Sequence, residues 1–208
     1  MTADLMVFLA KLISGANARW LGVAPDTRQR IYFANHTSNL DALVLWAVLP
    51  PEVRALTRPV AARDYWSTGI RRYMADKIFH AILIERHKPT AHDNPIEQIL
   101  EAMGSDKSII IFPEGTRSHT GTPQAFKAGL FHLAEQFPHV PLVPTWIDNV
   151  QRVMPKGEVV PVPILCTVTF GEPISLQPGE SKADFLVRAR EALLAHRPNP
   201  EWAEKVAA

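Results

Sequence analysis

Residues 109–118 read IIIFPEGTRS, a continuous apolar run that passes directly into a turn. A short run of this kind, bounded by proline and glycine, is typical of a strand that is buried inside a sheet. Together with Ser108 it predicts a strand over 108–112, and similar runs predict strands near 31–34, 56–61, 80–84, 142–146 and 165–170. Longer helical patterns alternate with these runs, at 39–48, 64–76, 91–103, 127–137 and 181–195. This alternation predicts an α/β domain, a mixed and mostly parallel sheet flanked by helices.

Length and composition favour one folded domain. The chain has 208 residues, of which 47% are hydrophobic and 21% charged, close to ordinary globular usage. The single cysteine, Cys166, cannot form an internal disulfide or a thiolate zinc cluster, and its strand setting indicates a buried small hydrophobe. A net charge of +1 carries no nucleic-acid signature. We therefore expect one domain over 23–208, preceded by a short helical segment over 1–22, and no nucleic-acid partner.

The N-terminal segment contains the apolar stretch LMVFLAKLI at 5–13. As a helix this stretch would be about 14 Å long, half a bilayer core at most. Because Asp4 precedes it and no Lys or Arg does, a secretory signal is disfavoured. Two interpretations stay open, a helix that caps the core and an amphipathic helix that lies at a membrane surface.

A histidine and an aspartate flank the start of the helix predicted at 39–48. The strand ending at Ala34 is followed by NHTSNLD, in which Ser38 or Asn39 can cap the helix. Asp41 would then lie in the first turn, with its carboxylate pointing back to the loop that holds His36. Such a carboxylate holds the proton on one ring nitrogen and leaves the other nitrogen as a base. The alternative is a loop histidine beside an ordinary first-turn acid.

Cationic residues follow the strand quoted above. Gly115 lets backbone amides approach a ligand, and the planar fork of Arg117 matches phosphate or carboxylate. Lys127 lies at the predicted start of a helix, a place that favours anions. Arg86 follows another strand, and ligands of α/β proteins bind at such strand ends. These residues predict an anion pocket; the alternatives are a surface ion pair of Arg117 with Glu114 and a solvated Lys127.

In order and content these motifs resemble the 1-acyl-sn-glycerol-3-phosphate acyltransferases of the glycerolipid acyltransferase superfamily. The family's Asn-His-x4-Asp block matches Asn35, His36 and Asp41, and its arginine block ends at Arg86. Its Phe-Pro-Glu-Gly-Thr-Arg-Ser block is unbroken at 112–118, and the runs FKAG at 126–129 and VPLVP at 140–144 also fit. The match covers roughly residues 31–171, and the first and third blocks together, in order, are highly specific. One departure is His80, which stands where the family commonly has glycine.

By this resemblance, residues 23–208 are an acyltransferase domain. The resemblance implies transfer of a fatty acyl group from acyl-CoA or acyl carrier protein to the free hydroxyl of lysophosphatidic acid, giving phosphatidic acid. His36 would be the general base, oriented by Asp41, and the hydroxyl would attack the thioester directly. The acceptor would be bound by six residues at strand ends, namely Arg86, Glu114, Gly115, Thr116, Arg117 and Lys127. No cofactor and no metal are implied.

Three other functions remain as alternatives. The acceptor could be another lysolipid, a lysophospholipid or lyso-aminolipid, because the departure at His80 bears on acceptor geometry. His36, Asp41 and Glu114 could instead be metal ligands of a phosphoester hydrolase. The protein could also be a non-catalytic lipid-binding relative.

The charge is unevenly distributed along the chain. Residues 54–88 contain eight Lys or Arg against three Asp or Glu, a local charge of +5 that suits anionic headgroups. No apolar run approaches the roughly 18 residues of a transmembrane helix. We therefore expect a peripheral or monotopic protein at the cytoplasmic face of the cell membrane.

Overall fold

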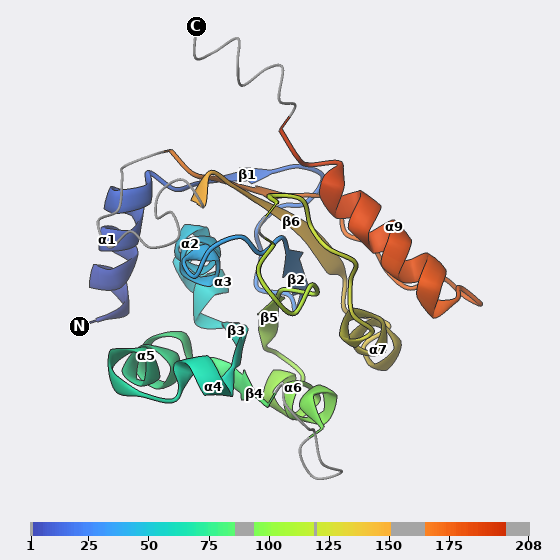
Figure 1. Cartoon of the computed structure of the whole chain (residues 1–208), viewed down its shortest axis with the longest axis horizontal. Helices are drawn as coiled ribbons and strands as arrows, with labels where there is room; N and C mark the ends of the chain where they lie inside the picture. Colours follow the sequence, from blue (N-terminus) through green and yellow to red (C-terminus); the bar gives the residue numbers. More distant parts are fainter. Residues whose placement is uncertain (1, 86–93, 119, 151–164, 199–208) are drawn as a thin grey trace, which may run out of the picture.

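The computed structural model describes residues 2–85, 94–118, 120–150 and 165–198 (Figure 1). In this part of the chain seven strands form one sheet, in the order β1-β7-β6-β2-β5-β3-β4. Neighbouring strands are parallel except for β6 and β7, which are antiparallel. The strands are β1 (Asn17–Trp20), β2 (Ile31–Ala34), β3 (Thr57–Ala62), β4 (Ile82–Ile84), β5 (Ser108–Ile111), β6 (Leu142–Asp148) and β7 (Thr167–Phe170). The predicted α/β fold with a mostly parallel sheet is confirmed.

Helices cover both faces of this sheet. They are α1 (Ala3–Ser14), α2 (Asp41–Val48), α3 (Pro51–Ala55), α4 (Arg63–Trp66), α5 (Gly69–Met74), α6 (Pro95–Met103), α7 (Gly129–Gln136) and α9 (Lys182–Leu194), with a π-helical turn η1 (Ala75–Phe79). Figure 1 shows α1, α2 and α3 on one side of the sheet and α6, α7 and α9 on the other. Strand β2 is buried on both faces, with Tyr32 in one hydrophobic cluster and Ile31 and Phe33 in the other.

The helix predicted over 64–76 is wrong as one element. The chain instead forms α4, α5 and η1, because Thr68 is extended and Gly69 has a left-handed φ of 59°. The helix predicted to begin at 127 begins at Gly129, and the Lys127 amide before it donates to the Pro113 carbonyl. The first part of the helix predicted at 91–103 lies outside the described residues.

Two elements were not predicted, β1 and α3. Strand β1 reads NARW, is only partly buried and lies at one edge of the sheet, where it pairs with β7. It therefore lacks the apolar run that marks the central strands, although it joins residues 17–20 to the same sheet. The short helix α3 begins at Pro51, a residue whose fixed φ suits the first helical position.

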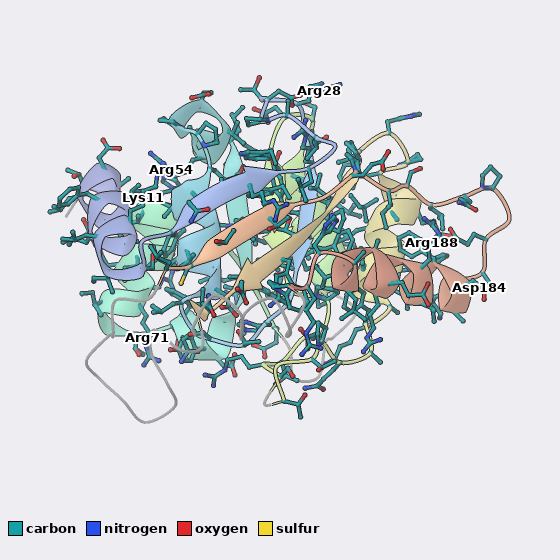
Figure 2. The ribbon with its side chains drawn as sticks, turned by 90° about the horizontal axis from the view of Figure 1, so that it is seen from above. Lys11, Arg28, Arg54, Arg71, Asp184 and Arg188 are labelled. Atoms are coloured by element: carbon teal, nitrogen blue, oxygen red, sulfur yellow. The ribbon has the colours of Figure 1, made fainter. Side chains whose placement is uncertain are left out.

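Helix α1 is capped by Thr2, whose hydroxyl accepts the Leu5 amide, and ends at Gly15 in a left-handed conformation. One side of α1 contributes Met6 and Ala10 to the core. Arg54 of α3 lies 3.6 Å from the Asp4 carboxylate and links the helix to the domain. Figure 2 shows Lys11 and Arg54 at this end of the molecule, and Asp184 and Arg188 on α9 at the opposite end. No helix in the described part of the chain is long and apolar enough to cross a membrane.

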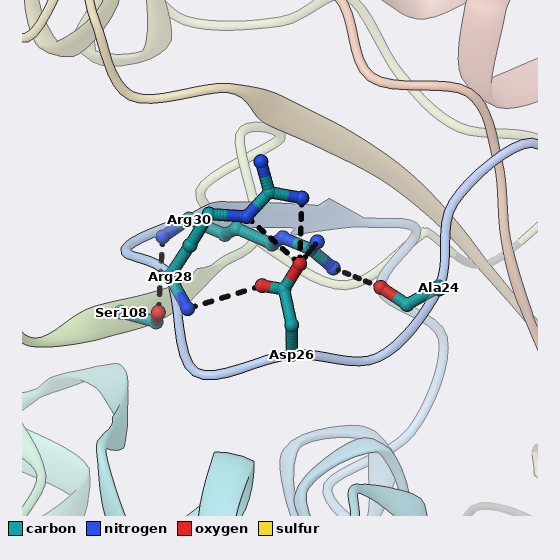
Figure 3. A network of polar contacts seen from close by, with 5 residues as sticks. All are labelled: Ala24, Asp26, Arg28, Arg30 and Ser108. Carbon is teal, nitrogen blue, oxygen red and sulfur yellow. Dashed lines mark hydrogen bonds and ion pairs between the residues drawn. The ribbon is translucent and has the colours of Figure 1, made fainter.

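A polar network fixes the chain just before β2 (Figure 3). The Asp26 carboxylate accepts hydrogen bonds from the guanidinium groups of Arg28 and Arg30, at 2.7 Å and 2.8 Å. Arg30 is buried, and it also donates to the Ala24 carbonyl, while its backbone amide donates to the Ser108 hydroxyl. The buried guanidinium thus has both a charged and a backbone partner, and the Arg30 amide holds the start of β2 to the start of β5.

Candidate active site

His36 and Asp41 are in contact in the loop between β2 and α2. The His36 Nδ1 and Asp41 Oδ2 atoms are 2.9 Å apart. The same carboxylate oxygen accepts the backbone amides of Thr37, at 2.6 Å, and Ser38, at 2.8 Å. Asp41 is completely buried, whereas the His36 side chain is 23% exposed. The predicted contact is therefore present, with the carboxylate pointing back over the loop.

The start of α2 differs from the expected capping. Leu40 occupies the cap position, and no side chain caps the helix. The Ser38 hydroxyl accepts the Leu40 amide at 3.3 Å, and the Asp41 carboxylate takes the loop amides. Asp41 is therefore used to fix the loop and the histidine together.

This contact determines what the imidazole can do. Because a carboxylate accepts and does not donate, Nδ1 carries the ring proton and Nε2 is left as a proton acceptor. The Phe112 ring stacks on the imidazole, with centroids 4.3 Å apart and an interplanar angle of 24°. The imidazole is thus held at one edge by Asp41 and on one face by Phe112. The sequence predicted the contact between His36 and Asp41, but it carried no signal for Phe112 as a contact.

Asn35 continues the sheet beyond the end of β2. Its side-chain amide donates to the Ile147 carbonyl at 2.9 Å, and its side-chain oxygen accepts the Ile147 amide at 2.7 Å. These two bonds connect the loop to β6 and are buried. Asn35 therefore fixes where the histidine loop leaves the sheet, a role that the motif alone did not indicate.

Glu114 lies in the turn after β5, with 2% of its surface exposed. Its Oε1 accepts the His36 amide at 2.9 Å, and its Oε2 accepts the Gln124 amide at 2.8 Å. Burial raises the pKa of this carboxyl group, while the two backbone hydrogen bonds act in the opposite direction. Among the described residues the structure contains no ion pair between Arg117 and Glu114.

Gly115 and Lys127 lie against each other. Gly115 has a φ of 68°, and a Cβ atom at this position would come within 2.9 Å of the Lys127 side chain, including Nζ at 2.8 Å. The exposed lysine side chain therefore crosses the turn. The Gly115 amide donates to the Phe112 carbonyl at 3.0 Å and closes the turn, so this amide faces inward.

Two further residues of the predicted site lie in the turn after β5, and the structure does not describe a third. Arg117 is half-buried and Thr116 is exposed in the same turn, which the Ser118 amide joins to the His36 carbonyl at 2.7 Å. Arg86 lies outside the described residues. The strand before it, β4, ends at Ile84 and runs parallel to its neighbour β3.

His80 ends η1 in a left-handed conformation, with φ 47° and ψ 44°. Glycine adopts this conformation without strain, whereas other residues rarely do. The backbone at His80 thus explains why glycine suits this position in the resembled family. The His80 side chain is exposed.

Most carboxylate oxygens of the residues considered as metal ligands already accept hydrogen bonds. Both oxygens of Glu114 accept backbone amides, and Asp41 Oδ2 already has three donors. In the described residues no group of three or more His, Cys, Asp or Glu could hold a metal ion.

Comparison with known proteins finds an acyltransferase family and individual acyltransferases that resemble this chain. The sequence profile of a family described as Acyltransferase matches residues 21–148. The chain is 31% identical over 160 residues to 1-acyl-sn-glycerol-3-phosphate acyltransferase alpha of Mus musculus, covering 74% of this chain and 53% of that protein. It is 33% identical over 167 residues to 1-acyl-sn-glycerol-3-phosphate acyltransferase of Limnanthes douglasii, covering 78% and 56% respectively. The chain thus spans about half the length of the curated relatives it matches.

A solved structure shares the fold. The crystal structure of the 1-acyl-sn-glycerophosphate (LPA) acyltransferase PlsC from Thermotoga maritima superposes with a TM-score of 0.67. The superposition covers 93% of this chain and 77% of that chain, at 20% sequence identity.

Proposed function

The chain belongs to the acyltransferase family, and on this premise we propose that it acylates a lysolipid. The acyl donor is a thioester, acyl-CoA or acyl carrier protein, and the acceptor is lysophosphatidic acid, so the product is phosphatidic acid. The observation that carries the proposal is the His36–Asp41 pair in the loop that follows β2. The names of the relatives support the choice of acceptor.

The reaction is a direct acyl transfer. His36 Nε2 takes the proton of the acceptor hydroxyl as its oxygen attacks the thioester carbonyl carbon, and Asp41 stabilises the imidazolium that forms. The tetrahedral intermediate collapses with cleavage of the carbon–sulfur bond. The leaving thiolate receives the proton from His36, which restores the neutral base and releases a free thiol. No covalent acyl-enzyme is needed, because a thioester already carries a good leaving group.

The acceptor phosphate would be held by the cations of the turn after β5. Lys127 crosses this turn at Gly115, and Arg117 lies two residues further along the chain. Ionised donors bind a phosphate about twice as strongly as neutral ones. Thr116, in the same turn, would add a hydroxyl, and Arg86 would add a second guanidinium. The lipid acceptor would be met at the cytoplasmic face of the cell membrane.

Thiol release from acyl-CoA tests the reaction. The detergent-solubilised protein should release free thiol only when lysophosphatidic acid is present, and His36→Ala should lower the rate by about 10²–10⁴-fold. The matched control is His139→Ala, which removes an exposed histidine and should leave the rate within about twofold. Equal thiol release by wild type and His36→Ala contradicts the proposal, as does no release by wild type. Bound metal in the purified protein, with release of phosphate from a phosphoester that a chelator abolishes, would support the metal-dependent alternative.

A second comparison tests the acceptor. Lys127→Met should raise the KM for lysophosphatidic acid by about tenfold or more, because the variant loses one charge-assisted contact with the phosphate. For a lysolipid without a phosphate monoester, the KM of the same variant should stay close to that of wild type. If such a lysolipid is the better wild-type substrate, the acceptor is another lysolipid. Repeating the assay with acyl carrier protein identifies the donor.

A further inference from the structure

The Glu114 side chain is buried and contacts the backbone of the loop that holds His36. We propose that it is a positioning residue, whose carboxylate holds the backbone of His36 and so sets the place of the base. This inference rests on the proposed function. The resemblance implied that Glu114 binds the acceptor, and the role assigned here is a different one.

Each carboxylate oxygen serves a different segment. Oε1 accepts the amide of His36, 78 positions earlier in the chain, and Oε2 accepts the amide of Gln124, ten positions later. One side chain therefore joins the loop after β2 to the segment that leads towards α7. Two acceptor atoms at a fixed separation are needed, which a carboxylate provides and an amide does not.

The same turn holds His36 at two further points. The Ser118 amide donates to the His36 carbonyl at 2.7 Å, and the Phe112 ring covers one face of the imidazole. With Asp41 on Nδ1, the amide, carbonyl, one ring face and one ring nitrogen of His36 are all engaged. The ring nitrogen left for chemistry is Nε2. Its position is set by the segment from Phe112 to Ser118.

Burial and charge both argue against contact with the acceptor. Glu114 is 2% exposed, so a glycerol hydroxyl would reach it only if the turn opened. A carboxylate also repels a phosphate, which binds cations such as Lys127 and Arg117. Burial raises the pKa of the Glu114 carboxyl, as expected for a group removed from solvent.

Glu114→Gln tests the role. Glutamine keeps one acceptor oxygen and places an NH₂ group against the second amide, so one of the two backbone bonds is lost. Displacing a catalytic group by about 1 Å can cost 10²-fold in rate, so kcat should fall by about 10–100-fold. Because the phosphate contacts remain, the acceptor KM should stay within about twofold, with or without a phosphate monoester on the acceptor. The rates are normalised to the folded fraction, measured by circular dichroism.

The control is Glu191→Gln, the same chemical change on the exposed surface of α9, which should leave both constants unchanged. If Glu114→Gln does not fold, Glu114→Asp keeps the charge but is one methylene too short to reach both amides, and the same fall in kcat is expected. An acceptor KM raised about tenfold at wild-type kcat, in either variant, overturns the proposal. So does a kcat that is unchanged per folded molecule, which would show a purely structural role.

One measurement is independent of the substrate. The proton on His36 Nδ1 should give a downfield NMR resonance in wild type that is absent from His36→Ala. In Glu114→Gln it should shift or broaden, because the ring is less firmly held against Asp41. An unchanged resonance overturns the positioning role. Absence of acyl transfer by wild type, with the shift present, would count against the proposed function alone.

Discussion

At the scale of single residues, Cys166 shows how burial decides reactivity. The side chain is fully buried, and burial raises the pKa of its thiol to about 11, with the carboxylates of Asp148 and Asp41 adding to the effect. Its backbone amide donates to the Ser14 carbonyl, and its carbonyl accepts the Asn17 amide. The interpretation of Cys166 as a buried small hydrophobe is confirmed.

Cys166 should therefore resist alkylation in the folded protein. Iodoacetamide reacts with the thiolate, which is scarce at about pH 8 when the pKa is near 11. We expect no modification of the native protein by mass spectrometry and complete modification in denaturant. Cys166→Ala should release thiol from acyl-CoA at the wild-type rate. Rapid alkylation of the native protein, with loss of activity, would instead point to Cys166 as an acyl acceptor.

At the scale of elements, backbone conformation at two residues decides where the helices between α4 and β4 begin and end. The apolar and aromatic residues of 64–76 suggested one helix, but Gly69 interrupts it and η1 ends at His80. Both positions have positive φ, and only the first is a glycine. A left-handed conformation costs an ordinary L-residue roughly 1–2 kcal/mol.

His80→Gly should consequently stabilise the protein. The relief of strain exceeds the extra entropy of glycine in the unfolded chain, so the free energy of unfolding should rise by about 0.5–1 kcal/mol. Chemical denaturation measures this change. His80→Ala is the matched control, since it removes the exposed imidazole but keeps the strained φ, and it should give no gain. Equal stabilisation by both variants would show that the side chain, and not the backbone, is responsible.

At the scale of the whole molecule, exposed apolar side chains gather at one end. Helix α1 exposes Leu5, Phe8, Leu9, Leu12 and Ile13, while α4 and α5 expose Tyr65, Ile70 and Tyr73. Both views place α1 and α5 at the same end of the molecule (Figures 1 and 2). The Arg71 guanidinium lies 4.5 Å from the centre of the Tyr65 ring, and Arg72 is also exposed. Helix α1 thus packs one side against the core and leaves an apolar side exposed.

Vesicle binding should depend on this end. Phe8→Glu combined with Leu12→Glu removes two apolar side chains worth about 1.5–3 kcal/mol each when buried, so partition onto vesicles should fall at least about tenfold. Arg71→Ala with Arg72→Ala should weaken binding to anionic vesicles only, and added salt should have the same effect. Sedimentation with phosphatidylcholine vesicles, with and without phosphatidylglycerol, measures both.

The control for membrane binding is Val187→Glu, which adds one negative charge, against two in the Phe8→Glu and Leu12→Glu variant, at an exposed apolar position of α9. It should bind vesicles as wild type does. If Val187→Glu loses as much vesicle binding as Phe8→Glu with Leu12→Glu, added negative charge alone reduces binding. That result would contradict a role of α1 in membrane binding.

Local patterns in the sequence were enough to predict the central strands and the contact between His36 and Asp41. Strands β2 and β5 are almost wholly apolar because both of their faces are buried, and such a run is visible without a structure. The contact of His36 with Asp41 spans only five residues, and the Thr37 and Ser38 amides between them also donate to Asp41 Oδ2, so a short loop at the start of α2 brings the two side chains together. The resemblance of the blocks around them supplied the expected chemistry.

Tertiary structure decided what depends on distant partners. The edge strand β1 and the antiparallel pairing of β6 with β7 were not visible in apolar patterns. The bonds of Glu114 to the amides of His36 and Gln124, and the path of Lys127 over Gly115, depend on how the loops at the ends of different strands meet. Short-range geometry is set by the chain's own dihedral preferences, whereas these contacts arise only when the whole sheet brings separate segments together.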